Sequence, residues 1–310
     1  MGATRTAIIL SCIVLMVPLA DARSIEPSDW EGWGVGEGGY SILVEEYTAT
    51  WCPRCAEIDP DLGIVAEEHG KRIAMVSYHP DEGDAFVPEA AEHRLQRYIT
   101  QHNNTPGYPS FVVNNGEIRE GVPSWPDVQS DILRAESNQR DYTKLTVTAQ
   151  TNETHLTVTV MPPKGNEIVN DTQYSILFIE HKKTVPSGFD NPGEKHRDRV
   201  LVGLVEFPME GEMVAIDASI EAPFVASYPT ENMEEWSVIV VHEYTKEALH
   251  NRTIMKMESQ PLGVVEFAVQ SSALEKGAEL PVILPVMVFL AVGILGLVTL
   301  QTKEKVREEE

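Results

Sequence analysis

Basic residues and cysteines are both scarce in this sequence. Its 310 residues include 24 Lys and Arg against 48 Asp and Glu, which gives a net charge of −24. A surface with this excess of negative charge repels the phosphates of nucleic acid, so we predict no nucleic-acid partner. The only three cysteines are Cys12, Cys52 and Cys55. A structural zinc site needs about four ligands, and cysteine alone does not supply them here.

Histidine would have to complete any metal site. His69, His79 and His93 could contribute in principle, but their spacing matches no recognised metal-binding pattern. The stretch from His242 to His250 does not contain HExxH. We therefore predict no metal and no cofactor, with the histidines solvated or hydrogen-bonded.

The N-terminus has the features of a secretory signal. Arg5 precedes the apolar run AIILSCIVLMVPLA, and Ala20-Asp21-Ala22 has the small-x-small form of a cleavage site. We predict that residues 1–22 are removed on export, and that Cys12 leaves with them. The alternative is an uncleaved anchor, for which the apolar run is short.

The C-terminal region resembles a membrane anchor. Residues 280–300 (Leu280 to Leu300) carry no charge, and an α-helix of this length crosses about 30 Å of hydrocarbon. Lys303, Lys305 and Arg307 follow in the tail 301–310, as expected for a cytoplasmic end. The sequence thus predicts a single-pass type I protein in the cell membrane, with residues 23–279 outside.

Sequons for N-glycosylation occur only in the region predicted to be outside. They have the form Asn-x-Ser/Thr, and they are candidate glycosylation sites if the host glycosylates. The four asparagines are Asn103, Asn152, Asn170 and Asn251.

The outer region divides into two parts with different patterns of predicted helices and strands. Residues 23–40 are rich in Gly and acidic residues and are predicted to be a loose lead-in. Residues 41–139 show the order β-α-β-α-β-β-α, in which Ile58, Leu62 and Val65 recur at helical spacing.

After residue 140 the sequence is rich in strand-like runs. Residues 140–259 contain seven such runs, the last of them RTIMKMES, and no convincing helix. This pattern predicts an antiparallel β-sandwich domain. Residues 260–279 would then form a stalk.

Cys52-Pro53-Arg54-Cys55 follows directly after a predicted strand and opens a predicted helix. Unpaired N–H groups and the positive end of the helix dipole lower the pKa of a thiol at this position and favour the reactive thiolate. Cys55, one turn later, can resolve a mixed disulfide. The alternative is a structural Cys52–Cys55 disulfide, although a loop this short gives little stabilisation.

The surroundings of the motif resemble the thioredoxin superfamily over residues 41–139. Trp51 precedes the first cysteine, Pro60 lies five residues after the second, and Tyr108-Pro109-Ser110 precedes FVVNNGE. The resemblance implies a thioredoxin-like α/β domain, a cis-proline at Pro109 that faces the cysteines, and Trp51, Tyr108 and Pro109 as substrate-binding residues. The dipeptide Pro-Arg and the longer segment after Cys55 depart from thioredoxin itself.

A secreted, membrane-associated subgroup of this superfamily couples such a domain to a C-terminal sandwich, and residues 140–259 resemble it loosely. The predicted fold class is therefore an α/β thioredoxin-like domain, then an all-β antiparallel sandwich domain, then one transmembrane helix.

Glu46 lies six residues before Cys52, where many thioredoxins have a buried acid that relays protons. A carboxyl buried on a strand beneath the disulfide would have a raised pKa and could act as base for Cys55. Its neighbour Glu45 would then point to the other face of the sheet. The alternative is a shifted strand with both glutamates solvated.

Together these features predict a membrane-anchored extracytoplasmic thiol-disulfide oxidoreductase, with Cys52, Cys55 and Glu46 as catalytic residues. Its substrates would be protein thiols and disulfides, and a separate redox partner would reset the pair. Oxidation, isomerisation and reduction are all compatible with the sequence. The competing hypothesis is a non-catalytic binding ectodomain in which the same scaffold carries a structural disulfide.

Overall fold

A computed structural model describes residues 24–138, 141–161, 169–230 and 233–271. In the first part of the chain the elements expected after residue 41 appear in the expected order, preceded by two strands. The elements are β1 (Ser24–Ile25), β2 (Trp33–Gly38), β3 (Ile42–Tyr47), α2 (Pro53–His69), β4 (Ile73–Tyr78), α3 (Glu89–His102), β5 (Ser110–Val113), β6 (Arg119–Glu120) and α4 (Trp125–Ser137), with short 3-10 turns at Pro27–Asp29, Gly70–Arg72 and Val122–Ser124.

The second part of the chain consists mainly of strands. Its one helix among the described residues follows β16. The elements are β7 (Leu145–Thr151), β8 (His155–Val160), β9 (Thr172–Glu180), β10 (Lys183–Thr184), β11 (His196–Arg197), β12 (Val200–Pro208), β13 (Val214–Ile216), β14 (Ser219–Ala222), β15 (Val225–Pro229), β16 (Trp236–Tyr244), α5 (Lys246–Ile254) and β17 (Gly263–Val269).

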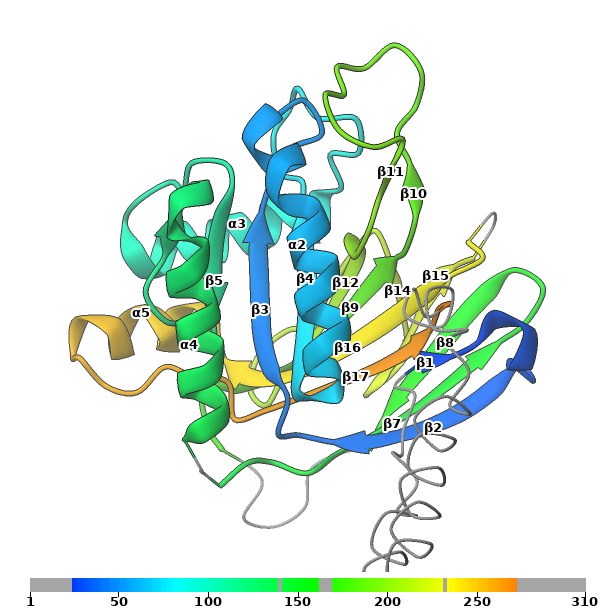
Figure 1. The fold of residues 1–310 in the computed structure, drawn as a ribbon. Helices are drawn as coiled ribbons and strands as arrows, with labels where there is room; N and C mark the ends of the chain where they lie inside the picture. The colour runs from blue at the N-terminus through cyan, green and yellow to red at the C-terminus, as the bar shows by residue number, and fades with distance from the viewer. Residues whose placement is uncertain (1–23, 139–140, 162–168, 231–232, 272–310) are drawn as a thin grey trace, which may run out of the picture. The chain divides into compact units, whose positions relative to one another are not determined.

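One ten-stranded sheet contains strands from both parts of the chain, in the order β1-β17-β16-β9-β12-β4-β3-β5-β6, with β13 beside β12 (Figure 1). The two parts meet where β4 pairs with β12 in parallel, Ser77 opposite Val200. The Ser77 N–H donates to the carbonyl of Arg199 at 2.9 Å. The predicted fold class is therefore wrong, because the C-terminal strands do not form a sandwich of their own beside an α/β domain.

The burial of three strands explains this correction. β9, β12 and β16 are buried at every position but the last, so both of their faces are covered. Strands covered on both faces carry continuous apolar runs and lie inside a large sheet, whereas sandwich strands alternate. The alternating strands β7 and β8 instead belong to a separate five-stranded sheet, β14-β15-β8-β7-β2.

Helix α3 covers one face of the ten-stranded sheet across the boundary between the two parts. Its Leu95 and Tyr98 lie in the same apolar core as Leu43 of β3, Leu177 of β9 and Val241 of β16. Burial of this shared apolar surface stabilises the two parts as one unit.

Two different layers pack on the opposite face of the ten-stranded sheet, one of helices and one of strands. Helices α2 and α4 pack on β3, β4 and β5, where Ile58 and Val128 contact the core around Val44. The five-stranded sheet packs on the C-terminal strands, with Val158 and Ile176 in a common core. The apolar positions predicted at helical spacing, Ile58, Leu62 and Val65, all lie on the buried face of α2.

Two arginines of α3 add ionic contacts to both parts of the chain. Arg94 Nη2 lies 2.6 Å from Glu45 Oε1 of β3, and Arg94 Nη1 lies 2.7 Å from Glu243 Oε1 of β16. Arg97 Nη2 lies 3.0 Å from Glu243 Oε2. Burial alone would raise the pKa of Glu243, but the two guanidinium groups lower it to about 2. The resulting network is buried, and Glu243 stays ionised within it at neutral pH.

Strand β2 occupies part of the segment predicted to be a loose lead-in. Its glycines alternate along one face, where a Cβ at Gly34 would lie 2.6 Å from the ring of Phe267. A Cβ at Gly38 would lie 2.7 Å from Cγ2 of Val265. Glycine is therefore needed for close packing on β17, and this regular Gly-x-Gly pattern is typical of a strand approached closely by its neighbour.

Two further expectations fail near the C-terminal end of the described chain. RTIMKMES is not a strand, because Arg252 and Ile254 lie in helix α5, which Thr245 caps by accepting the Ala248 N–H at 3.3 Å. Residues Gly263–Val269, predicted to be stalk, form β17 and pair with β16.

The predicted targeting segments lie outside the described residues. This applies both to the signal at 1–22 and to the span at 280–300. Among the residues that the structure describes, no helix combines the length and apolar character needed to cross a bilayer.

Candidate redox site at Cys52 and Cys55

Cys52 and Cys55 form a disulfide at the start of helix α2. Cys52 is the N-cap residue, and its Sγ accepts the N–H of Cys55 at 3.1 Å. Pro53 opens the helix, a position where its missing N–H has no consequence. After reduction, the same N–H and the helix dipole would lower the pKa of the Cys52 thiol. Both cysteines are buried, with Cys52 4% exposed and Cys55 1% exposed.

Two sequence-predicted residues, Trp51 and Tyr108, lie beside the disulfide, and Pro109 follows Tyr108 in the chain. Tyr108 packs on the pair of cysteines, and its ring centroid lies 6.1 Å from that of exposed Trp51. The Tyr108–Pro109 peptide is cis, and Pro109 is buried. The Pro109 carbonyl accepts the Gly121 N–H at 2.8 Å, which attaches this loop to the turn before α4. The structure therefore brings Trp51, Tyr108 and the two cysteines together.

Glu46 is buried on β3, on the opposite face of the sheet from Glu45. It is 2% exposed, and its Oε2 accepts the Ser77 hydroxyl at 2.6 Å. Its Oε1 has no hydrogen-bond partner among the described residues. Burial, followed by the negative charge of Asp59, raises the pKa of Glu46 to about 8. The alternative in which both glutamates are solvated is wrong.

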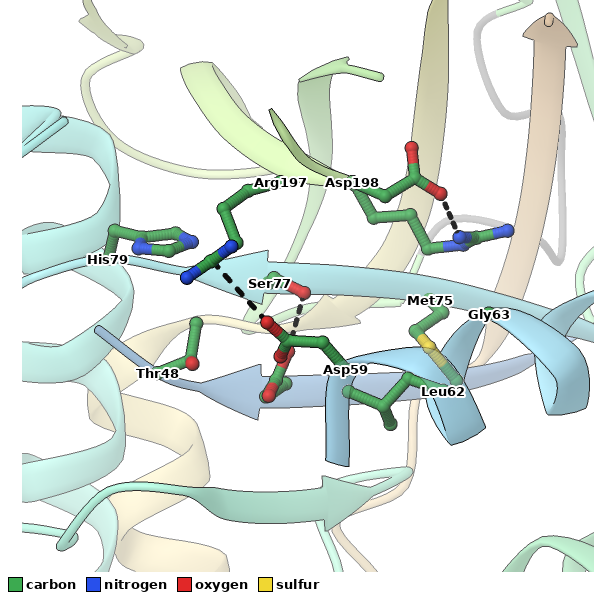
Figure 2. Close-up of a pocket in the computed structure, with 11 residues that line it drawn as sticks. Thr48, Asp59, Leu62, Gly63, Met75, Ser77, His79, Arg197 and Asp198 are labelled. Carbon is green, nitrogen blue, oxygen red and sulfur yellow. Dashed lines mark hydrogen bonds and ion pairs between the residues drawn. The ribbon is translucent and has the colours of Figure 1, made fainter. Parts of the chain in front are cut away.

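A small cavity of about 40 Å³ lies between β3, β4 and α2. Glu46 and Asp59 both line it, and Figure 2 shows Asp59 pointing from α2 toward Arg197. Burial raises the pKa of Asp59 to about 6, although the positive charge of Arg197 opposes this shift. Two carboxyl groups with separated pKa values therefore share one cavity.

Arg197 reaches this cavity from β11, in the second part of the chain. Its Nε lies 3.4 Å from Asp59 Oδ2, and its Nη2 donates to the carbonyl of Thr50 at 3.3 Å. Thr50 and Arg197 are 147 positions apart in sequence, so no local pattern could have indicated this contact. Neither Asp59 nor Arg197 was among the residues predicted from the sequence to form the site.

Arg197 also holds the loop between β10 and β11 against α2. Its guanidinium donates to the Glu194 carbonyl and to Asn191 Oδ1, both at 2.6 Å. In the same loop, a Cβ at Gly193 would lie 2.8 Å from the Cβ of Ala56. A loop from the second part of the chain therefore lies directly beside the residue that follows Cys55.

Asp84 fixes the loop on the other side of the cysteines. Its Oδ2 accepts the Thr50 N–H at 2.5 Å and contacts His79 Nδ1 at 2.9 Å. Burial alone would raise the pKa of Asp84, but the bonds from His79, Thr50 and Phe86 hold it below its ordinary value. Thr50 is thus held through both its N–H and its carbonyl, two residues before Cys52.

The histidines considered as metal ligands lie apart. His69 Nδ1 contacts Glu136 at 2.8 Å, His79 contacts Asp84, and His93 Nε2 lies 3.3 Å from Glu206. In the part of the chain that is described, no three His, Cys, Asp or Glu side chains form a group that could hold a metal ion.

The sequon asparagines are all exposed. Asn103 ends α3 in a left-handed conformation, and Asn251 lies in α5. Asn152 Oδ1 accepts the N–H groups of Thr154 and His155 in a turn. The four positions are Asn103, Asn152, Asn170 and Asn251.

No family model and no curated protein matches this chain. Two solved structures are similar. The first is HBP35 of Porphyromonas gingivalis, with a TM-score of 0.46 and 12% identity, covering 76% of this chain and 78% of that one. The second is an X-ray structure of a protein from Agrobacterium tumefaciens, with a TM-score of 0.42 and 12% identity, covering 75% of this chain and 95% of that one. Neither likeness is close enough to support an argument about this chain.

Proposed function

We propose that this protein is a thiol-disulfide oxidoreductase of the thioredoxin superfamily, acting on protein thiols and disulfides. The observation that carries the proposal is the Cys52–Cys55 disulfide at the N-terminus of α2, with Tyr108 of the cis-proline loop packed on it. A purely structural disulfide across one turn contributes little stability and does not require that loop.

In the reducing direction, the thiolate of Cys52 attacks a disulfide of the substrate. One substrate sulfur leaves as a thiolate and takes a proton, and the other stays bound to Cys52 as a mixed disulfide. Cys55 then loses its proton to a base and attacks Cys52 Sγ, which releases the second substrate thiolate. The protein pair is oxidised by two electrons and the substrate disulfide is reduced; oxidation of a substrate is the same sequence in reverse.

Glu46 is the base for Cys55 in this scheme. It is buried on β3, the strand that precedes the cysteines, and its raised pKa lets it both accept and return a proton near neutral pH. Trp51 and Tyr108 supply the surface on which the substrate chain is held.

We also propose an extracytoplasmic location, where disulfides persist. The predicted signal at residues 1–22 supports it. Another protein would reset the pair after each turnover, because no further cysteine follows Cys55.

The test uses full-length protein in a Cys12→Ser background, so that the pair supplies the only thiols. Cys52→Ser is expected to abolish reduction or formation of disulfides in insulin, a model substrate. Cys55→Ser is the matched control: it should accumulate a mixed disulfide through Cys52. Equilibration with glutathione and dithiothreitol buffers gives the reduction potential and separates oxidant from reductant.

The competing function, a binding scaffold with a structural disulfide, is favoured by the low exposure of Cys52. It predicts that the pair resists equilibration with the buffers, and that neither serine variant forms a mixed disulfide.

A further inference from the structure

We propose that Asp59 is the solvent-side carboxylate of a two-carboxylate proton relay for Cys55, in which Arg197 is the positioning residue. This inference rests on the proposed function and extends it to residues outside the motif. Asp59 follows Cys55 by one helical turn, so the two side chains lie on the same face of α2. Glu46 approaches the same place from β3.

The cavity between the carboxyl groups is large enough for water. Its volume is about 40 Å³. A single water needs about 10–15 Å³ and two to four polar partners. The cavity is lined by polar groups that could bond to such a water, among them Glu46, Asp59 and Ser77. Glu46 Oε1 accepts no hydrogen bond from the described residues. A bridging water would therefore satisfy a buried acceptor and connect the two carboxyl groups.

The two carboxyl groups differ in their access to solvent. Glu46 is 2% exposed, whereas the side chain of Asp59 is 28% exposed. A proton taken up by Glu46 therefore has no direct route to bulk water, and Asp59 provides one. Arg197 holds Asp59 at the cavity through its Nε, while its Nη2 binds the carbonyl before Trp51.

The charges around the pair decide which carboxyl group holds the resting proton. Burial raises both pKa values, to about 8 for Glu46 and about 6 for Asp59. Between these values the pair holds one proton, mostly on Glu46, and Asp59 is ionised. The other groups that face the pair are Thr48, Ser77, His79, Arg197 and Glu194, with Asp198 and Arg199, paired to each other, at the rim of the cavity.

In the step itself, Glu46 first passes its resting proton through the cavity water to ionised Asp59, which releases it to solvent. The Cys55 thiol then gives its proton to Glu46, and the resulting thiolate attacks Cys52 Sγ. The bond between Cys52 and the substrate sulfur breaks, and that sulfur leaves with the electron pair. The reverse order returns a proton to Cys55 when the pair is reduced.

The experiment measures resolution of a mixed disulfide on full-length Cys12→Ser protein between pH 5 and 9. Reduced protein is mixed with one equivalent of Ellman's reagent: the first thionitrobenzoate reports attack by Cys52, and the second reports resolution by Cys55. Asp59→Asn should slow the second phase about tenfold at pH 7, a modest share of ordinary acid-base catalysis. The effect should vanish below about pH 6, where wild-type Asp59 is itself protonated.

Asp61→Asn is the matched control, because it removes the same charge from an exposed position of the same helix. It should leave both phases within about twofold of wild type. Arg197→Gln should move the onset of the fast resolution phase to higher pH, since the pKa of Asp59 rises without the guanidinium.

The outcomes separate the inference from the proposed function. No release of the second thionitrobenzoate by wild type would overturn the function itself. If wild type resolves and Asp59→Asn matches Asp61→Asn, the relay is wrong and the function stands. Faster resolution by Asp59→Asn at pH 7 would also overturn the relay, because Asp59 would then act only by its charge, which raises the pKa of Glu46. If Asp59→Asn slowed the second phase equally at every pH, Asp59 would have a merely structural role and the relay would be wrong.

Discussion

Glu45 and Glu46 are adjacent on β3, both buried, and point to opposite faces of the sheet with opposite surroundings. Glu45 faces α3, where Arg94 Nη2 lies 2.6 Å and the Tyr78 hydroxyl 2.8 Å from its Oε1. Glu46 faces α2, where it accepts the Ser77 hydroxyl, and its other oxygen has no hydrogen-bond partner in the part of the chain that is described. Glu45 thus pairs directly with a guanidinium group, whereas Glu46 bonds to a hydroxyl and lines a cavity.

This difference shows how the same residue type becomes structural or chemically active. On the α3 face, the pKa of fully buried Glu243 falls to about 2, because two arginines outweigh the burial that would raise it. On the α2 face, the pKa of equally buried Glu46 rises to about 8. A carboxylate that stays ionised connects elements, whereas one that titrates near neutral pH can move protons.

The largest expected effect on stability comes from removing a buried ion-pair partner on the α3 face of the sheet. Arg94→Met should lower the free energy of unfolding by about 3–5 kcal/mol, because it removes the guanidinium beside buried Glu45 and one of the two guanidinium groups beside buried Glu243. Urea denaturation at pH 7 measures the change. Arg134→Met, on the exposed surface of α4, should change it by less than about 0.5 kcal/mol. Equal effects of the two variants would mean that the buried network adds no stability.

The pH dependence of stability tests the α2 face. The pKa of Glu46 is higher in the folded than in the unfolded state. Its contribution to the free energy of unfolding is therefore fully present below pH 4.5 and is lost as pH rises through about 8. Glu46→Gln should remove this loss, which is on the order of 4 kcal/mol between pH 5 and 9. Urea denaturation at both pH values measures it. The exposed control Glu57→Gln should retain the wild-type slope.

Catalysis should depend on the same carboxyl group. Glu46→Gln should slow resolution by Cys55 about a hundredfold near neutral pH, because the base is lost, while attack by Cys52 is almost unchanged. The two-phase thionitrobenzoate assay measures both rates, again beside Glu57→Gln. An unchanged second phase in Glu46→Gln would remove Glu46 from the mechanism.

A smaller change should sharpen the contrast. Ser77→Ala removes the hydroxyl that lowers the pKa of Glu46, so the pH at which resolution becomes fast should rise by less than about one unit. The buried hydrogen bond should cost about 1 kcal/mol in urea denaturation. If resolution instead became fast at a lower pH in Ser77→Ala, Glu46 would not be the group whose ionisation controls the resolution rate.

Much of the local structure around the cysteines was predictable from the sequence. Ile58, Leu62 and Val65 predicted the buried face of α2, and the strand pattern placed Glu45 and Glu46 on opposite faces. These features depend on periodicity and on contacts between neighbours in the chain, so a short window of sequence contains them. The Gly-x-Gly alternation of β2 and the continuous apolar runs of β9, β12 and β16 were also present, but were not interpreted as a packed strand and as the centre of a covered sheet.

By itself, the sequence determined the Cys-x-x-Cys helix start, the elements around it and the acidic surface, because each depends on composition or on local spacing. Only the tertiary structure decided that strands from both parts of the chain share one sheet, and that Arg197 reaches Asp59 and Thr50. Such pairings join residues more than a hundred positions apart. They depend on which apolar faces can be covered together, and that is a property of the whole chain.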